Sequence, residues 1–137
     1  MKHNLTLFLI FSVFSFHGVP AAVADEFTQE DIDVWQAEYM AVVQKGRDLF
    51  TDPALGNSEN GVICGQCHPN GANTHPETYP KFQKQIGRVI GLWEMVNWCL
   101  RNPLEAEPLD AASPDMTAII AYMAHERRGV PLEPGKH

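Results

Sequence analysis

The stretch Cys64-Gly65-Gln66-Cys67-His68 is the most informative part of this chain of 137 residues. Its spacing, C-x-x-C-H, is that of the attachment site for a c-type haem. We expect the thiols of Cys64 and Cys67 to form thioethers with the haem vinyl groups, and His68 to bind the iron as its proximal ligand. The motif therefore predicts one covalently attached haem c, and it leaves the reaction at the iron open.

The first 24 residues have the pattern of a secretory signal peptide. A short basic start precedes an apolar run over residues 5–16, and Ala22-Val23-Ala24 supplies small residues for cleavage. The run is shorter than the roughly 20 apolar residues that span a bilayer. We therefore expect a cleaved signal peptide over residues 1–24, a cytochrome c domain over residues 25–137, and a periplasmic or otherwise exported protein. An uncleaved membrane anchor is the alternative.

Acidic residues outnumber Lys and Arg by 17 to 10, which gives a formal net charge of −7. A balance this acidic argues against nucleic acid and anionic membranes as partners. The charges are unevenly spread, because acidic residues crowd residues 25–38 whereas Lys and Arg gather in residues 81–101. This asymmetry favours an oriented encounter with a redox partner protein, and an ordinary solvated surface is the alternative.

Apolar residues recur at helical spacing in three stretches. The first predicted helix covers Asp31–Phe50, and the second covers residues 81–101. The third begins after Ser113, with Pro114 in its first turn. Residues 69–80 are rich in Pro, Gly and Asn, which predicts an irregular loop after the haem motif. Because no strand pattern appears, we predict an all-α fold.

The order of these features resembles that of class I cytochromes c. The first predicted helix ends with Gly46 and Phe50 four residues apart, the haem motif follows, and the last helix contains Ala118–Met123, which reads Ala-Ile-Ile-Ala-Tyr-Met. The resemblance implies helices packed around one haem, with the terminal helices crossing at a small residue against an aromatic side chain of the last helix. Gly46, Phe50 and Tyr122 stand at the matching positions.

The residue on the other side of the iron is not set by the motif. Class I cytochromes c usually place a Met there, but Cys99 has no intrachain disulfide partner if Cys64 and Cys67 are thioethers. Met95 and Cys99 are four residues apart in a predicted helix, so both project from one face of it. From the residues alone, the candidates for the distal ligand remain Cys99, Met95, Met116, Met123, His75 and His125.

The second half of the chain resembles thiosulfate dehydrogenases and Sox-type sulfur-oxidation cytochromes. The matching stretches are Glu94–Cys99, Asn102-Pro103-Leu104, Pro108-Leu109 and Asp115–Tyr122, and Tyr79-Pro80 is similar to a Tyr/Phe-Pro pair in those proteins. Their haem is held by His and Cys, so the resemblance implies Cys99 as the distal ligand, with Met95 as the alternative. The spacing from His68 to Cys99 is shorter than theirs, and they commonly carry two haems where this chain has one motif.

In size the chain is more similar to the small monohaem His/Cys cytochromes of the NaxLS type, which pair as heterodimers and bind NO and CO. An anionic thiolate on the iron stabilises the ferric state and lowers the potential, whereas a Met raises it. We therefore predict low-potential electron transfer. NO or CO binding and a second cytochrome subunit, in a hetero- or homodimer, are further expectations.

Three other functions remain open. The first is the haem subunit of a sulfur-oxidising oxidoreductase in which Cys99 contacts the substrate. The second is an ordinary His/Met electron shuttle. The third has no haem, and in it the three cysteines and a histidine form a Cys₃His zinc site. The sequence favours an electron carrier or a ligand-binding haem protein over an enzyme.

Overall fold

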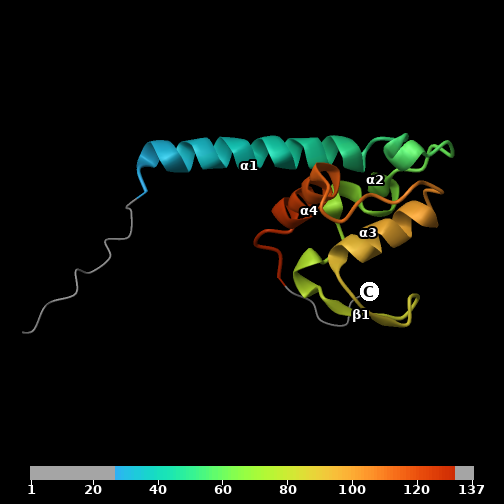
Figure 1. The fold of residues 1–137 in the computed structure, drawn as a ribbon. Coiled ribbons are helices and arrows are strands. Elements are labelled where there is room, and N and C mark those ends of the chain that lie inside the picture. Colours follow the sequence, from blue (N-terminus) through green and yellow to red (C-terminus); the bar gives the residue numbers. More distant parts are fainter. Residues whose placement is uncertain (1–26, 132–137) are drawn as a thin grey trace, which may run out of the picture.

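The structure, a computed structural model, describes residues 27–131, so the predicted signal peptide lies outside the described residues. Figure 1 shows a mostly helical domain with one small hairpin. No helix within residues 27–131 is long and apolar enough to cross a membrane. The predicted all-α framework is confirmed. The helices are α1 (Gln29–Phe50), α2 (Cys64–Cys67), α3 (Leu92–Arg101) and α4 (Pro114–Glu126), the strands are β1 (Lys81–Gln83) and β2 (Arg88–Ile90), and the 3₁₀ turns are η1 (Leu55–Asn57), η2 (Pro69–Gly71) and η3 (Pro76–Thr78).

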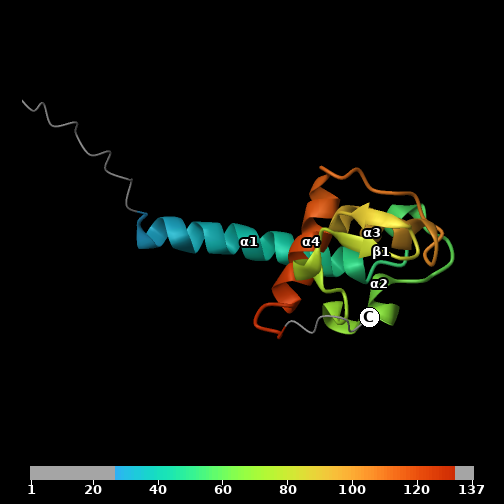
Figure 2. The same ribbon diagram turned by 90° about the horizontal axis from the view of Figure 1, so that it is seen from below.

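Helix α1 begins where the sequence provides a reciprocal cap. The Thr28 hydroxyl accepts a hydrogen bond from the Asp31 backbone N–H at 3.2 Å, and Asp31 Oδ2 accepts one from the Thr28 N–H at 2.9 Å. The pKa of Asp31 is lowered because its carboxylate accepts hydrogen bonds from the Thr28 hydroxyl, at 2.6 Å, and from the Thr28 N–H. The first half of α1 extends beyond the rest of the domain (Figures 1 and 2), and Ile32, Val34 and Trp35 are exposed there. All buried residues of α1 lie in its second half.

Helices α1 and α4 cross at Gly46. A Cβ atom at this position would lie 1.9 Å from the Ala118 carbonyl oxygen and 2.8 Å from the Tyr122 Cβ, so the crossing requires glycine. The rings of Phe50 and Tyr122 pack beside the crossing, with centroids 5.2 Å apart and planes inclined at 59°. The crossing expected from Gly46, Phe50 and Tyr122 is therefore confirmed.

The helix predicted over residues 81–101 is wrong in its first half. Residues 81–90 form an antiparallel hairpin, and α3 begins only after it. Between the two strands Gly87 has φ +80°, a left-handed conformation that favours glycine and interrupts a helix. Helix α3 has a start of its own, because the Glu94 carboxylate accepts a hydrogen bond from the Gly91 N–H at 2.9 Å.

The core lies between the second half of α1, the end of α3 and α4. Its members come from both ends of the described chain, and Figure 2 shows α4 crossing α1 with most of the intervening segment on one side of the crossing. The core side chains are Val43, Phe50, Leu55, Leu100, Leu104, Ile119, Tyr122 and Met123.

We expect Gly46→Ala to lower the free energy of unfolding by about 3 kcal/mol or more, because the added methyl group meets backbone atoms instead of a flexible side chain. Urea unfolding of the haem-loaded protein measures this. The matched control is Gly65→Ala, whose Cβ would lie 3.7 Å or more from its neighbours and which should change the stability by less than about 1 kcal/mol. Equal stability of the two variants would contradict the described crossing.

Candidate haem-binding site

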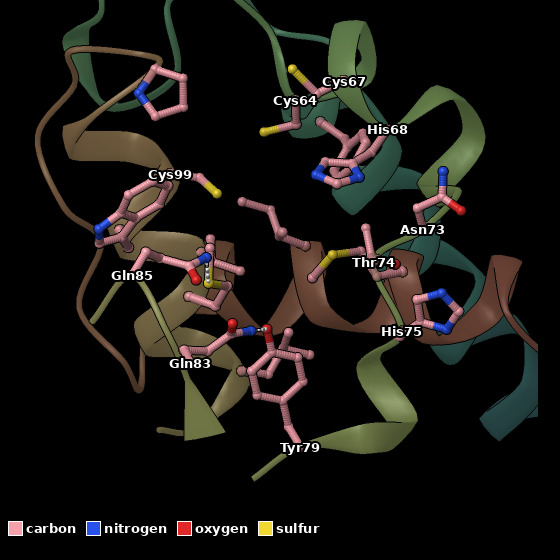
Figure 3. Close-up of a pocket in the computed structure, with 18 of the residues that line it drawn as sticks. Cys64, Cys67, His68, Asn73, Thr74, His75, Tyr79, Gln83, Gln85 and Cys99 are labelled. Atoms are coloured by element: carbon pink, nitrogen blue, oxygen red, sulfur yellow. Dashed lines mark hydrogen bonds between the residues drawn. The ribbon is translucent and has the colours of Figure 1, made fainter. Parts of the chain in front are cut away.

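A cavity of about 620 Å³ opens beside the haem motif. Its volume lies within the range of about 300–1,000 Å³ that is usual for cofactor sites. The walls come from α2, the loop of residues 73–79, the hairpin, α3 and α4 (Figure 3). This arrangement suits a large apolar group held by a few polar side chains. The apolar lining consists of Phe50, Ile63, Leu92, Val96, Leu104, Ile119 and Met123.

The two cysteines of the motif lie in the single turn α2, at one end of the cavity. The turn is closed by a hydrogen bond from the His68 N–H to the Cys64 carbonyl at 3.0 Å, and both thiols are free. Cys67 is exposed, whereas Cys64 is half-buried, and this burial raises the pKa of Cys64 to about 11. Both cysteines approach the cavity from one side, as attachment to one edge of a porphyrin ring requires.

His68 follows α2, and a hydrogen bond orients its ring. Nδ1 lies 2.9 Å from the Ala72 carbonyl oxygen, and since a carbonyl only accepts, Nδ1 carries the hydrogen and donates it. The neutral ring then keeps a free lone pair on Nε2, the arrangement usual for metal-binding histidines. His68 is half-buried and faces the cavity in Figure 3. This placement fits the predicted proximal ligand.

Cys99 and Met95 line the same cavity from α3, one turn apart. In Figure 3 the Cys99 thiol points into the cavity from the side opposite the His68 ring. Burial, and secondarily the nearby Cys67, raise the pKa of Cys99 to about 11, so the group is a neutral thiol unless a cation binds it. Met95 Sδ accepts a weak hydrogen bond from Gln85 Nε2 at 3.8 Å. Both residues thus remain candidates for the distal ligand.

The remaining candidates for the distal ligand have packing roles. Met116 is fully buried and does not line the cavity, and Met123 lines it as a member of the core cluster. His125 lies against Tyr39, with 3.4 Å between His125 Nδ1 and the phenol oxygen, and it does not line the cavity. Cys99 differs from these three, because its thiol points into the cavity from the side opposite the His68 ring.

His75, the last candidate, belongs to a cluster that the sequence pattern does not reveal. Its Nδ1 lies 3.2 Å from Glu77 Oε1 and 3.3 Å from Arg127 Nη2, although Arg127 is 52 residues further along the chain. Burial opposes ionisation of Glu77, but a backbone hydrogen bond, His75 and Arg127 together lower its pKa. The cluster joins the loop after the haem motif to the end of α4, and no local pattern signals such a distant contact.

Asn97 orders the chain beyond α3, although the sequence pattern does not single it out. Its side chain is 3% exposed, donates from Nδ2 to the Leu109 carbonyl at 2.8 Å, and accepts from the Leu109 N–H at 2.9 Å. These two hydrogen bonds hold residues 102–109 against the helix that carries Cys99. In the sequence, Asn97 is recognisable only as a polar residue within the apolar stretch of α3.

The donor groups suit a haem better than a zinc ion. Within residues 27–131 no group of three or more His, Cys, Asp or Glu side chains is gathered closely enough to hold a metal ion, so the Cys₃His alternative has no assembled ligand set there. Instead, two thiols, an oriented imidazole and a facing thiol or thioether border an apolar space. A haem bound there supplies one-electron redox chemistry.

Residues 45–132 match the family model described as the SoxA/TsdA cytochrome c domain. The chain belongs to this family. It is 28% identical over 79% of its length to the L-cysteine S-thiosulfotransferase subunit SoxA of Rhodovulum sulfidophilum, and 31% identical over 69% of its length to the thiosulfate dehydrogenase of Psychrobacter arcticus. The matches cover 38% and 32% of those proteins, so the chain spans about a third of the length of the curated relatives it matches.

Membership of this family confirms the resemblance to class I c-type cytochromes and to the Sox and thiosulfate dehydrogenase types. It also supports covalently bound haem c and haem electron transfer as properties of this SoxA/TsdA-type domain. The number of haems, the two iron ligands and the low potential remain predictions.

Asn97→Leu is expected to lower the free energy of unfolding by about 1–3 kcal/mol, because the N–H and C=O of Leu109 lose their buried partners. Calorimetry of the haem-loaded protein measures the loss. Asn102→Ala serves as the control, since its side chain only donates to the Trp98 carbonyl at the surface and its removal should cost about 0.5 kcal/mol. An Asn97 variant as stable as this control would show that the paired hydrogen bonds do not hold the segment.

Proposed function

We propose that this chain is an exported monohaem cytochrome c in which His68 and Cys99 bind the iron and electrons pass to and from redox partner proteins. The observation that carries the proposal is that the His68 ring and the Cys99 thiol face one apolar cavity from opposite sides (Figure 3). The family supports the haem, and the one C-x-x-C-H motif in the sequence supports a single haem.

Each of these side chains has a distinct part in binding. The hydrogen bond to the Ala72 carbonyl keeps the His68 ring in the tautomer that presents Nε2 to a metal. Cys99 would hold the iron as a thiolate, because the positive charge of the metal would offset the burial that otherwise disfavours the anion. An anionic ligand in an apolar site favours ferric iron, which supports the low potential.

EPR spectroscopy of the purified ferric protein tests the ligand pair. We expect a low-spin signal of the thiolate type that disappears in Cys99→Ala and persists in the matched control Met95→Leu. Cys99→Met should raise the reduction potential by on the order of 0.1 V, because axial ligands set haem potentials over a range of about 0.8 V. A signal that survives in Cys99→Ala and changes in Met95→Leu would instead support an ordinary His/Met shuttle.

A second candidate is a haem subunit of a sulfur-oxidising oxidoreductase in which Cys99 contacts the substrate. Its support is that the matched relatives are named thiosulfate dehydrogenase and L-cysteine S-thiosulfotransferase subunit, and that the family match runs through α3 and α4. This candidate includes a partner chain, in keeping with the word subunit in the name of the SoxA relative.

Thiosulfate-dependent reduction of ferricyanide separates the two candidates. For an electron carrier we expect no steady turnover by the haem-loaded protein, either alone or together with a candidate partner chain, because an electron carrier transforms no substrate. Turnover that is lost in Cys99→Ala and kept in Met95→Leu would establish the sulfur-oxidising candidate and displace the electron carrier.

Export, dimer formation and small-ligand binding belong to the same proposal. The signal-peptide pattern supports export, since it leads the cysteines to a compartment in which disulfides and thioethers form. A second cytochrome subunit and the binding of NO or CO rest on the resemblance to the small His/Cys cytochromes alone.

A further inference from the structure

The cavity has a polar end that the haem motif does not explain. In Figure 3 Cys64 and Cys67 lie at one end of the cavity, and the opposite end carries Tyr79 and Gln83. Lys81 also lines the cavity, and it lies on the same face of β1 as Gln83. Thioethers form at one edge of a porphyrin, and its two propionate chains leave the opposite edge. The geometry points to a carboxylate-binding site in which Tyr79, Lys81 and Gln83 hold the haem propionates.

Two hydrogen-bond donors are available at this end. The Tyr79 oxygen accepts a hydrogen bond from Gln83 Nε2 at 2.7 Å, which leaves the hydroxyl hydrogen of Tyr79 free to donate. No acceptor for that hydrogen is present among residues 27–131. Burial raises the pKa of Tyr79, so the hydroxyl keeps its proton at neutral pH. The second hydrogen on Gln83 Nε2 is the other donor, and both suit a carboxylate acceptor.

Positive charge gathers at the same end of an otherwise acidic chain. Residues 81–90 contain three cations and no Asp or Glu, although the net charge of the whole sequence is −7. Arg88 is paired with Glu94, whereas no carboxylate within the described residues pairs with Lys81 or Lys84. Lys81 Nζ lies 4.7 Å from the centroid of the Tyr79 ring, which keeps it beside the donor. Burying a carboxylate costs free energy unless a cation or a hydrogen-bond donor offsets its negative charge, and Lys81 and Tyr79 are placed to do so.

This inference rests on the proposed haem binding, and Tyr79→Phe tests it separately. The variant keeps the ring and removes the donor, so the propionate charge acts more strongly on the iron and favours the ferric state. We expect the ferric-to-ferrous ratio at a fixed applied potential to rise about two- to tenfold, the scale of one hydrogen bond. The propionate bending band in the resonance Raman spectrum should shift as well.

Lys81→Gln should change the ratio in the same direction, and Lys81→Arg should restore it because the charge is retained. Since Lys81 is only partly buried, these variants keep the test decisive if Tyr79→Phe does not fold. Arg88→Gln is the control, because it removes one positive charge from an exposed position of the same hairpin that does not line the cavity. Equal shifts in Lys81→Gln and Arg88→Gln would indicate a general field effect and overturn the contact with Lys81.

The haem content of each sample separates failure of this inference from failure of the proposed function. Unchanged ratios and Raman bands in Tyr79→Phe and Lys81→Gln, with normal covalent haem, would overturn the carboxylate site and leave the cytochrome intact. A wild-type protein that lacks covalently bound haem after export and maturation would overturn both.

Discussion

The backbone contact between Gly46 and Ala118 is the constraint on which the rest of the fold depends. It brings α1 and α4 closer than a side chain at position 46 would permit, and the rings of Phe50 and Tyr122 fill the space beside it. These helices come from opposite ends of the described chain, so residues 51–113 form one long segment anchored at both ends. The cavity lies within this segment and against α4, so its shape depends on the crossing.

The segment between the two helices contains little regular structure, so a few specific contacts decide its path. The Ala72 carbonyl orients His68, and Asn97 binds the backbone of Leu109 on both its donor and its acceptor. The first contact fixes the ring of His68, and the second holds the chain against the helix that carries Cys99. An apolar cavity of about 620 Å³ is unfavourable when filled with water, and a group that binds only the folded chain stabilises it by mass action. Cofactor binding and folding are therefore coupled in this domain.

The sequence predicts this architecture where the signal is local. The helices α1 and α4 have long apolar stripes and polar caps, and the haem motif places three site residues within five positions. The sequence predicts a helix where the hairpin lies, because the apolar residues of the hairpin also recur at a spacing near four. The positive φ of Gly87, which ends any helix there, does not affect the hydrophobic periodicity. The contacts of Arg127 with His75 and of Tyr79 with Gln83 depend on how loops fold against the cavity, which spacing alone does not encode.

Two opposed electrostatic effects meet in the proposed site. A Cys99 thiolate acts directly on the iron and favours the ferric state, whereas cations and donors at the propionate end offset negative charge and favour the ferrous state. In this proposal the Cys99 ligand would set the range of the potential, and the charges of the hairpin would adjust it. Phe82 and Val89, which pair across the same hairpin beside its basic residues, are 62% and 60% exposed. If the proposed redox partner is acidic and docks on this surface, it would alter the charge near the propionates and so link its binding to the reduction potential.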